Sequence, residues 1–191
     1  MLFRSAKVVA DGKGRFGGFA TLPLGDTDGA LKEIEYALDT LKLDGVGLFT
    51  NYEGKWLGDP VFDPVFAELN RRKAVAYVHP IAAPCCVLPQ PFIAEAIIEY
   101  GTDTTRAIAS YIFLGAAKKF PEVTMIWSHA GGTMPFLIER MDAAQNMPAN
   151  KANAPEGFRA AAAKMYFDVA QASNVAAMSA LRRVVPTSQI V

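Results

Sequence analysis

The chain has 191 residues, of which 51% are hydrophobic and 20% charged, so it can bury one large core and is not expected to be disordered. Nineteen basic residues balance nineteen acidic ones, and this neutrality indicates neither a nucleic-acid partner nor binding to an anionic membrane surface. No apolar run is long enough to predict a membrane-spanning helix.

The first half of the chain alternates short apolar runs with segments of helical periodicity. It predicts, in order, a strand at 16–24, a helix that Asp26 or Asp28 can cap, a strand at 46–50, a long loop at 51–61 and a helix that begins near Pro64. The apolar face of the first helix is predicted from residues at helical spacing: Leu31, Ile34, Leu38 and Leu41.

The second half continues the same alternation. It predicts strands at 75–79, 123–128 and 165–169, helices at 102–119, 135–145 and 175–184, and a further strand that begins at 189–191. Apolar strands that alternate with helices indicate a parallel sheet covered by helices. Both a doubly wound sheet and a closed barrel fit this order, although a (β/α)8 barrel needs eight strands.

The two histidines of the chain, His79 and His129, both stand at the end of a predicted strand. Catalytic groups and ligands collect at the carboxyl ends of parallel strands, so the two side chains are candidates for one site. A single histidine at a strand end is more often structural, but the same position for both favours a functional interpretation. A catalytic zinc site typically takes three protein ligands, and two histidines alone do not supply them.

Three other positions carry polar or reactive groups. Asp168 lies in an apolar strand, where it either orients a neighbouring histidine or bonds local backbone. Arg140 stands beside Glu139, a pattern typical of a surface ion pair. Cys85 and Cys86 are adjacent and poorly placed to bridge each other, so we expect free thiols and a reducing, cytoplasmic setting.

Four segments carry a family likeness: DGVGLFTNYEGKWLGDPVFDPVFAELNRRKAVAYVHP, DTTRAIAS, WSHAGGTMPFLIERM and MYFDVA. Together they resemble the amidohydrolase-related metal-dependent hydrolases, a group that includes aminocarboxymuconate-semialdehyde decarboxylase and resorcylate decarboxylase. The likeness covers residues 14–191, and the ordered series of motifs is what makes it specific.

The resemblance implies a partial (β/α)8 TIM-type barrel that contains roughly strands three to seven. Residues 1–191 would form one incomplete barrel domain without strands one, two and most of eight, and residues 1–7 do not match the family. The family binds one divalent metal, commonly zinc, through an HxH pair, a strand-five histidine and a strand-eight aspartate. His79 matches the metal ligand of strand five, and His129 matches the catalytic histidine of strand six.

The chain contains no HxH pair and stops before the expected aspartate. We therefore expect it to be a part of a longer enzyme, with metal binding weak or absent in these residues alone. A doubly wound ligand-binding domain is a poorer alternative, because no glycine-rich phosphate loop follows the first predicted strand.

The resemblance also implies an activity, the decarboxylation of a small aromatic or unsaturated carboxylic acid with His129 as general acid or base. Hydrolysis of a C–N or C–O bond and a catalytically inactive truncated barrel are the alternatives. In some of the resembled decarboxylases an arginine near the position of Arg140 reaches across a dimer to hold the substrate carboxylate. Arg140 is thus a candidate substrate ligand, and a homodimer is expected.

Overall fold

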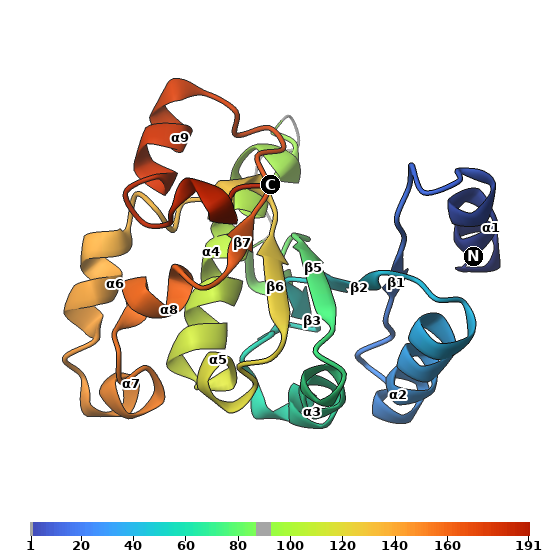
Figure 1. Cartoon of the computed structure of the whole chain (residues 1–191). Coiled ribbons are helices and arrows are strands. Elements are labelled where there is room, and N and C mark those ends of the chain that lie inside the picture. Colours follow the sequence, from blue (N-terminus) through green and yellow to red (C-terminus); the bar gives the residue numbers. More distant parts are fainter. Residues whose placement is uncertain (1, 87–92) are drawn as a thin grey trace.

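The computed structural model describes residues 2–86 and 93–191, and its centre is a five-stranded parallel sheet (Figure 1). The strands are β1 (Phe19–Thr21), β2 (Gly45–Phe49), β5 (Val75–His79), β6 (Thr124–Trp127) and β7 (Tyr166–Phe167). They lie in the order β1-β2-β5-β6-β7, and every pair is parallel. A doubly wound sheet reverses its strand order at a switch point, and this sheet does not, so that alternative is wrong.

Helices precede β1, occupy the connections between consecutive strands of this sheet and follow β7. They are α1 (Leu2–Asp11), α2 (Thr27–Glu35), α3 (Asp63–Arg71), α4 (Glu95–Phe113), α5 (Ala116–Lys119), α6 (Ile138–Ala144), α7 (Pro148–Asn153), α8 (Phe158–Ala162) and α9 (Val175–Leu181). A singly wound parallel sheet with helical crossovers is the geometry of one arc of a (β/α) barrel. None of the described helices is long and apolar enough to cross a membrane.

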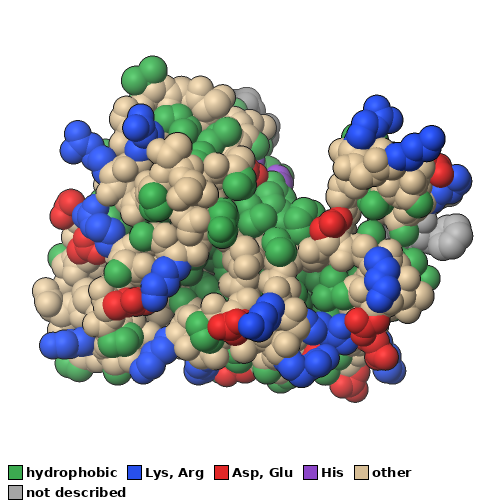
Figure 2. All heavy atoms as spheres, viewed as in Figure 1, with side chains coloured by type: hydrophobic (Ala, Val, Ile, Leu, Met, Phe, Trp, Pro, Cys, Tyr) green, Lys and Arg blue, Asp and Glu red, His purple; other side chains and the backbone are tan. Residues whose placement is uncertain are grey.

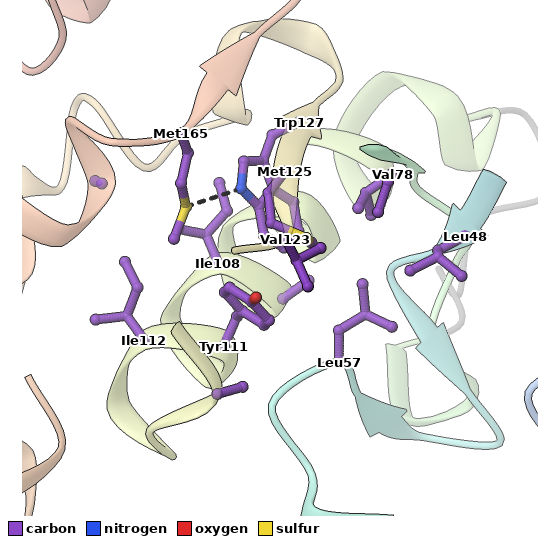
Figure 3. Close-up of a cluster of buried hydrophobic side chains, with 14 of the residues drawn as sticks. Leu48, Leu57, Val78, Ile108, Tyr111, Ile112, Val123, Met125, Trp127 and Met165 are labelled. Carbon is purple, nitrogen blue, oxygen red and sulfur yellow. Dashed lines mark hydrogen bonds between the residues drawn. The ribbon is translucent and has the colours of Figure 1, made fainter. Parts of the chain in front are cut away.

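The two faces of the sheet differ in burial. Side chains on the face toward the helices, such as Val46, Val78 and Trp127, are fully buried. Figure 3 shows this core, in which the Trp127 indole N–H donates to the Met165 sulfur at 3.0 Å and packs edge-on against Tyr111. The alternate side chains of the same strands lie on the opposite face, which these helices leave open.

Several predicted boundaries move. The strand expected at 16–24 is reduced to β1, and the loop expected at 51–61 contains a short antiparallel hairpin of β3 (Asn51–Tyr52) and β4 (Lys55–Trp56). The first predicted helix is α2, which ends at Glu35 and continues as a π-helix, Tyr36–Thr40. Of the four predicted apolar positions Ile34 is fully buried, together with Ala30 and Ala37, whereas the three leucines are only partly buried. The Asp26 cap is confirmed, since its carboxylate accepts from the Gly29 amide.

The end of the chain begins to extend the sheet. A short turn, Thr187–Gln189, leads to Ile190, which forms a parallel bridge with Phe167 of β7. The amide of Val191 donates to the Phe167 carbonyl at 2.9 Å. The predicted strand start at 189–191 therefore lies where the next barrel strand would pair.

Candidate functional site

His79 and His129 lie side by side at the carboxyl ends of β5 and β6. Their ring centroids are 5.3 Å apart, and the rings meet edge to face at 71°. Tyr100 of α4 completes an aromatic cluster, with its ring 5.7 Å from His79 and 6.4 Å from His129. The sheet thus brings together the two histidines that the sequence singled out, and it adds Tyr100, which the sequence analysis missed.

The imidazole of His79 is oriented by its own loop. Its Nδ1 lies 2.9 Å from the Pro80 carbonyl oxygen, which can only accept, so Nδ1 carries the proton in this contact. In the neutral ring with this tautomer, Nε2 is the nitrogen that has a lone pair to offer. This tautomer, with one ring nitrogen anchored by a carbonyl and the other free, is the form in which histidine binds metals.

His129 is held in a strained turn. His129 and Ala130 both have a φ of +55°, in the left-handed region that side chains other than glycine rarely adopt. Gly131 and Gly132 follow with φ of +74° and +64°, and a Cβ on Gly132 would overlap the carbonyl oxygen of Gly101 in α4. The paired glycines therefore serve a tight turn that packs directly on a helix backbone.

Asp168 is the group that holds this turn. One carboxylate oxygen accepts from the His129 amide at 2.8 Å and from the Ala170 amide at 3.0 Å. The other accepts from the Tyr77 hydroxyl at 2.7 Å, across the width of β6. Of the two interpretations of Asp168, the contacts show the bond to local backbone, and this backbone includes the amide of His129.

The surroundings of His129 favour the neutral form of its imidazole. Burial lowers the pKa of His129, and nearby His79 lowers it further, while the carboxylate of Asp168 opposes the shift. Burial and then the hydrogen bond to Asp168 raise the pKa of Tyr77, so its hydroxyl stays a donor. The buried Nδ1 of His129 has no hydrogen-bond partner among the described residues, which leaves it available to another group.

The open face of the sheet adjoins this site. A hollow of about 220 Å³ is lined by Phe19, Phe49, Tyr77 and His79, with Phe19 and Tyr77 stacked at 6.1 Å. In Figure 2, hydrophobic side chains gather in the hollow that separates α1 from the rest of the molecule. The face that carries His79 is therefore apolar and aromatic.

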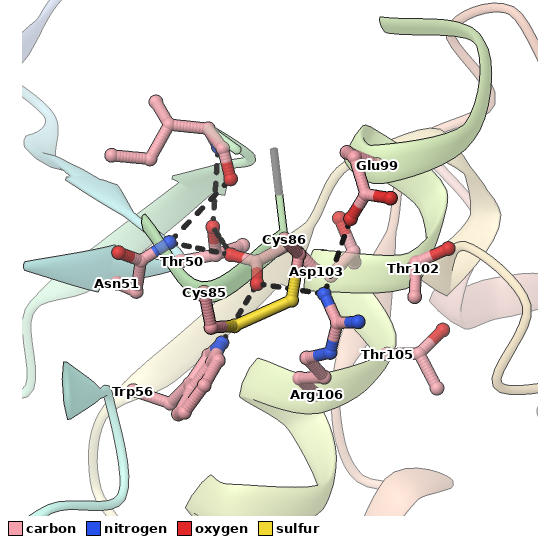
Figure 4. A network of polar contacts seen from close by, with 12 residues as sticks. Thr50, Asn51, Trp56, Cys85, Cys86, Glu99, Thr102, Asp103, Thr105 and Arg106 are labelled. Atoms are coloured by element: carbon pink, nitrogen blue, oxygen red, sulfur yellow. Dashed lines mark hydrogen bonds and ion pairs between the residues drawn. A yellow bond between two sulfur atoms is a disulfide. The ribbon is translucent and has the colours of Figure 1, made fainter. Parts of the chain in front are cut away.

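A buried polar network joins α4 to the segment that follows β2 (Figure 4). The sequence analysis did not predict it. Asp103 of α4 is fully buried and accepts from the Thr50 hydroxyl at 2.5 Å, the Asn51 amide at 2.7 Å and the Trp56 indole at 2.8 Å. Thr50 in turn accepts from the Ile81 amide at 3.2 Å, two residues after His79. The network therefore fixes the loop that follows the candidate metal ligand.

The two cysteines lie close to this network. The structure joins Cys85 and Cys86 in a disulfide, so the expectation that adjacent sulfurs would not bridge is wrong. Both residues belong to a short 3-10 turn, Pro84–Cys86, and their side chains point toward one another (Figure 4). The two cysteines therefore no longer support the expectation of a reducing compartment.

Arg140 does not join the histidine cluster. It is exposed on α6, where its backbone amide donates to the Leu137 carbonyl at 2.9 Å, and its guanidinium forms no hydrogen bond or ion pair within 2–86 and 93–191. Its neighbour Glu139 pairs with Arg159 at 2.7 Å instead, so the expected surface ion pair forms without Arg140.

The described residues do not assemble a complete metal site. Over 2–86 and 93–191, no three histidine, cysteine, aspartate or glutamate side chains are grouped to hold an ion. The donor set that fits a metal is the free Nε2 of His79, which amounts to one ligand of the several that a catalytic metal needs.

Comparison with known proteins gives a consistent picture. The model of a family described as amidohydrolase matches residues 4–184. The chain is 39% identical over 183 residues to 6-methylsalicylic acid decarboxylase of Penicillium expansum, an alignment that covers 93% of this chain and 56% of that protein. The chain therefore spans little more than half the length of this curated relative.

Solved structures with the same fold include two decarboxylases. The 5-carboxyvanillate decarboxylase of Sphingomonas paucimobilis superposes with a TM-score of 0.89 at 23% identity, over all of this chain and 59% of that one. A dihydroxybenzoic acid decarboxylase from Polaromonas, solved with manganese, gives 0.82 at 19% identity, over all of this chain and 61% of that one. At these identities the likeness shows the shared fold, which confirms the partial barrel.

Proposed function

Because the chain belongs to the amidohydrolase family, we propose that it is the central part of a metal-dependent decarboxylase that acts on a small aromatic carboxylic acid. The observation that carries the proposal is the placement of His79 and His129, 5.3 Å apart at neighbouring strand ends of a barrel arc. The relative from Penicillium is named for the decarboxylation of a hydroxybenzoic acid, which sets the expected substrate class.

In this reaction the bond between the ring carbon and the carboxylate breaks, CO2 leaves, and the electron pair on the carbon takes up a proton. We assign the proton transfer to His129. Burial lowers the pKa of His129, so the imidazole, once it has taken up a proton from solvent, is a stronger acid toward a carbon base. The aromatic ring of Tyr100, stacked at 25° beside His129, offers a flat wall for a planar substrate.

Asp168 and Tyr77 act as positioning residues in this proposal. The Asp168 carboxylate holds the amide of His129 at 2.8 Å, and Tyr77 holds the carboxylate at 2.7 Å. Since His129 has a left-handed backbone, these contacts fix an orientation that the turn alone would not keep.

We propose that His79 supplies one ligand to a divalent metal through Nε2, and that other parts of the complete protein supply the rest. When bound, such a metal polarises a substrate oxygen and stabilises the charge that develops there. The family resemblance favours zinc, whereas the Polaromonas enzyme was solved with manganese, and metal analysis of the complete protein would distinguish them.

The open apolar face of the sheet fits an incomplete barrel. Further strands of the complete protein would cover Phe19, Phe49 and Tyr77 and turn the present hollow into an enclosed site. We also propose a homodimer in which exposed Arg140 reaches the substrate carboxylate of the partner subunit, a pairing that suits a guanidinium.

The test is to give the complete protein 6-methylsalicylic acid and follow CO2 release. The proposal predicts turnover in the presence of a divalent metal, and a loss of at least about a hundredfold in His129→Gln, the effect of removing a general acid. Release of an alcohol or amine from ester or amide substrates, without CO2 from carboxylic acids, would favour hydrolysis instead. Absence of both activities in metal-loaded protein would overturn the proposal.

A further inference from the structure

A second cavity lies at the opposite end of the same strand from the histidine site. It has a volume of about 230 Å³ and is bounded by α4, α5, the start of β6 and the segment from α7 to β7. Val123 and Met125 line it, and His129 lies beyond the other end of β6, roughly 20 Å from Val123 at the rise of a strand. All its lining residues fall between Tyr111 and Met165, so the cavity does not depend on segments outside this chain.

Apolar side chains form the walls of the cavity. Ile112, Phe120, Met125 and Met165 line it and are almost completely buried. An apolar cavity of about 150 Å³ in another protein accepts benzene, so 230 Å³ has room for one substituted aromatic ring. Shape and surface therefore favour a flat, apolar molecule.

Two polar side chains of the lining are at least partly buried, Tyr111 and Asn153, and the side-chain amide of Asn153 already donates to the Phe113 carbonyl at 2.6 Å. Tyr111 is 1% exposed, and burial raises its pKa, so the hydroxyl stays protonated. Within 2–86 and 93–191 the hydroxyl has no hydrogen-bond partner, although Tyr111 lines the cavity. The hydroxyl is therefore free to donate to a water or to a ligand in the cavity.

The charged groups at the mouth are already satisfied. Lys164 pairs with both oxygens of Glu156, at 2.6 and 2.7 Å, and Lys118 donates to the Ala152 carbonyl at 3.0 Å. These exposed side chains frame the entrance and leave the Tyr111 hydroxyl as the donor that a ligand would meet inside. The ligand therefore needs one acceptor oxygen and no strong charge.

We propose that this cavity is a binding site for a single-ring aromatic molecule with a phenolic or carbonyl oxygen, which accepts a hydrogen bond from Tyr111. The site is separate from the histidine cluster and does not rest on the proposed decarboxylase activity. The cavity lies between the start of β6 and the helices α4, α5, α7 and α8, so a small molecule bound there would stabilise the fold without touching the reacting groups.

The test is calorimetric titration of the complete protein with 4-bromophenol, followed by location of the bromine by anomalous diffraction. The proposal predicts saturable binding with the bromine among Ile112, Phe120 and Met125. Tyr111→Phe should weaken binding about tenfold, the value of one hydrogen bond. Its thermal stability should be unchanged or higher, since the variant loses only an unpaired hydroxyl.

Two further variants keep the test decisive. Tyr36→Phe alters an exposed tyrosine on the far side of the fold and should leave the affinity unchanged. Ala161→Leu narrows the cavity and should abolish binding, and a folded Ala161→Leu that still binds would contradict the assignment. Bromine located elsewhere, equal affinity in Tyr111→Phe and wild type, or an ordered water on Tyr111 with no saturable binding would each overturn the proposal.

Discussion

Removal of the Asp168 side chain should release the turn that carries His129. The carboxylate accepts three hydrogen bonds, from the His129 and Ala170 amides and the Tyr77 hydroxyl. Hydrogen bonds to a charged group are worth about 1.5–3 kcal/mol each, but Asp168 is only half-buried and water can replace part of them. In addition, release of the turn relieves backbone strain, which in the left-handed region costs about 1–2 kcal/mol for each of His129 and Ala130.

We therefore expect Asp168→Ala to lower the free energy of unfolding by about 2–4 kcal/mol, less than the sum of three bonds because strain is relieved. Asp168→Asn keeps the shape and one acceptor oxygen, and should cost about 1–2 kcal/mol. Urea unfolding gives the free energies, and NMR spectra report the His129 amide and ring. A loss below about 0.5 kcal/mol in Asp168→Ala with unshifted His129 resonances would refute the positioning role.

Three other substitutions follow from the structure. Asp103→Ala should lower the free energy of unfolding by about 3–5 kcal/mol in urea, because it leaves the donors of Thr50, Asn51 and Trp56 without their acceptor. Gly132→Ala should lower the free energy of unfolding more than Gly14→Ala does. Both glycines have a positive φ, but only a Cβ at Gly132 would meet a backbone oxygen. Glu68→Gln should lower stability at pH 7 by less than about 1 kcal/mol, because the arginine pairs of Glu68 are near the surface.

The effect at Glu68 has a defined pH dependence. Hydrogen bonds from Arg71 and Arg72 lower the pKa of Glu68 to about 2, so its stabilising contribution is present at neutral pH and is lost as pH falls toward 2. Curves of stability against pH for wild type and Glu68→Gln should therefore converge in acid. A difference in stability between wild type and Glu68→Gln that stays constant down to about pH 2 would contradict the argument for Glu68. Equal losses of stability in Gly14→Ala and Gly132→Ala would contradict the argument for Gly132. An Asp103→Ala variant as stable as wild type would contradict the argument for Asp103.

The sequence predicted the features that local pattern encodes. Apolar runs marked all five strands of the main sheet, and a histidine at the end of two runs marked the two residues that the sheet brings together. The strand order could not be read from those runs, because a doubly wound sheet and a barrel have the same local alternation. The family likeness, and then the pairing of each strand with the next, decided it.

The polar networks could not be predicted from the sequence, because they join residues that are far apart in the chain. Tyr77 and Asp168 are 91 residues apart in the chain, and Thr50 and Asp103 are 53 apart, so neither pair leaves a trace at short spacing. The start of α4 was predicted too late. The predicted helix began at Thr102, whereas α4 begins at Glu95 and runs through Gly101. The close contact between α4 and the turn after His129 requires the glycine at 132, since a Cβ there would overlap the Gly101 carbonyl oxygen, whereas a Cβ at Gly101 would make an ordinary contact at 3.8 Å.

The central claim is that His79 binds a metal and His129 moves a proton. It is tested most directly by metal content and CO2 release in His79→Ala and His129→Gln, each made in the complete protein. The account predicts that His79→Ala loses both metal and activity, whereas His129→Gln keeps its metal and loses activity. Full metal content in His79→Ala, or wild-type turnover in His129→Gln, would contradict it.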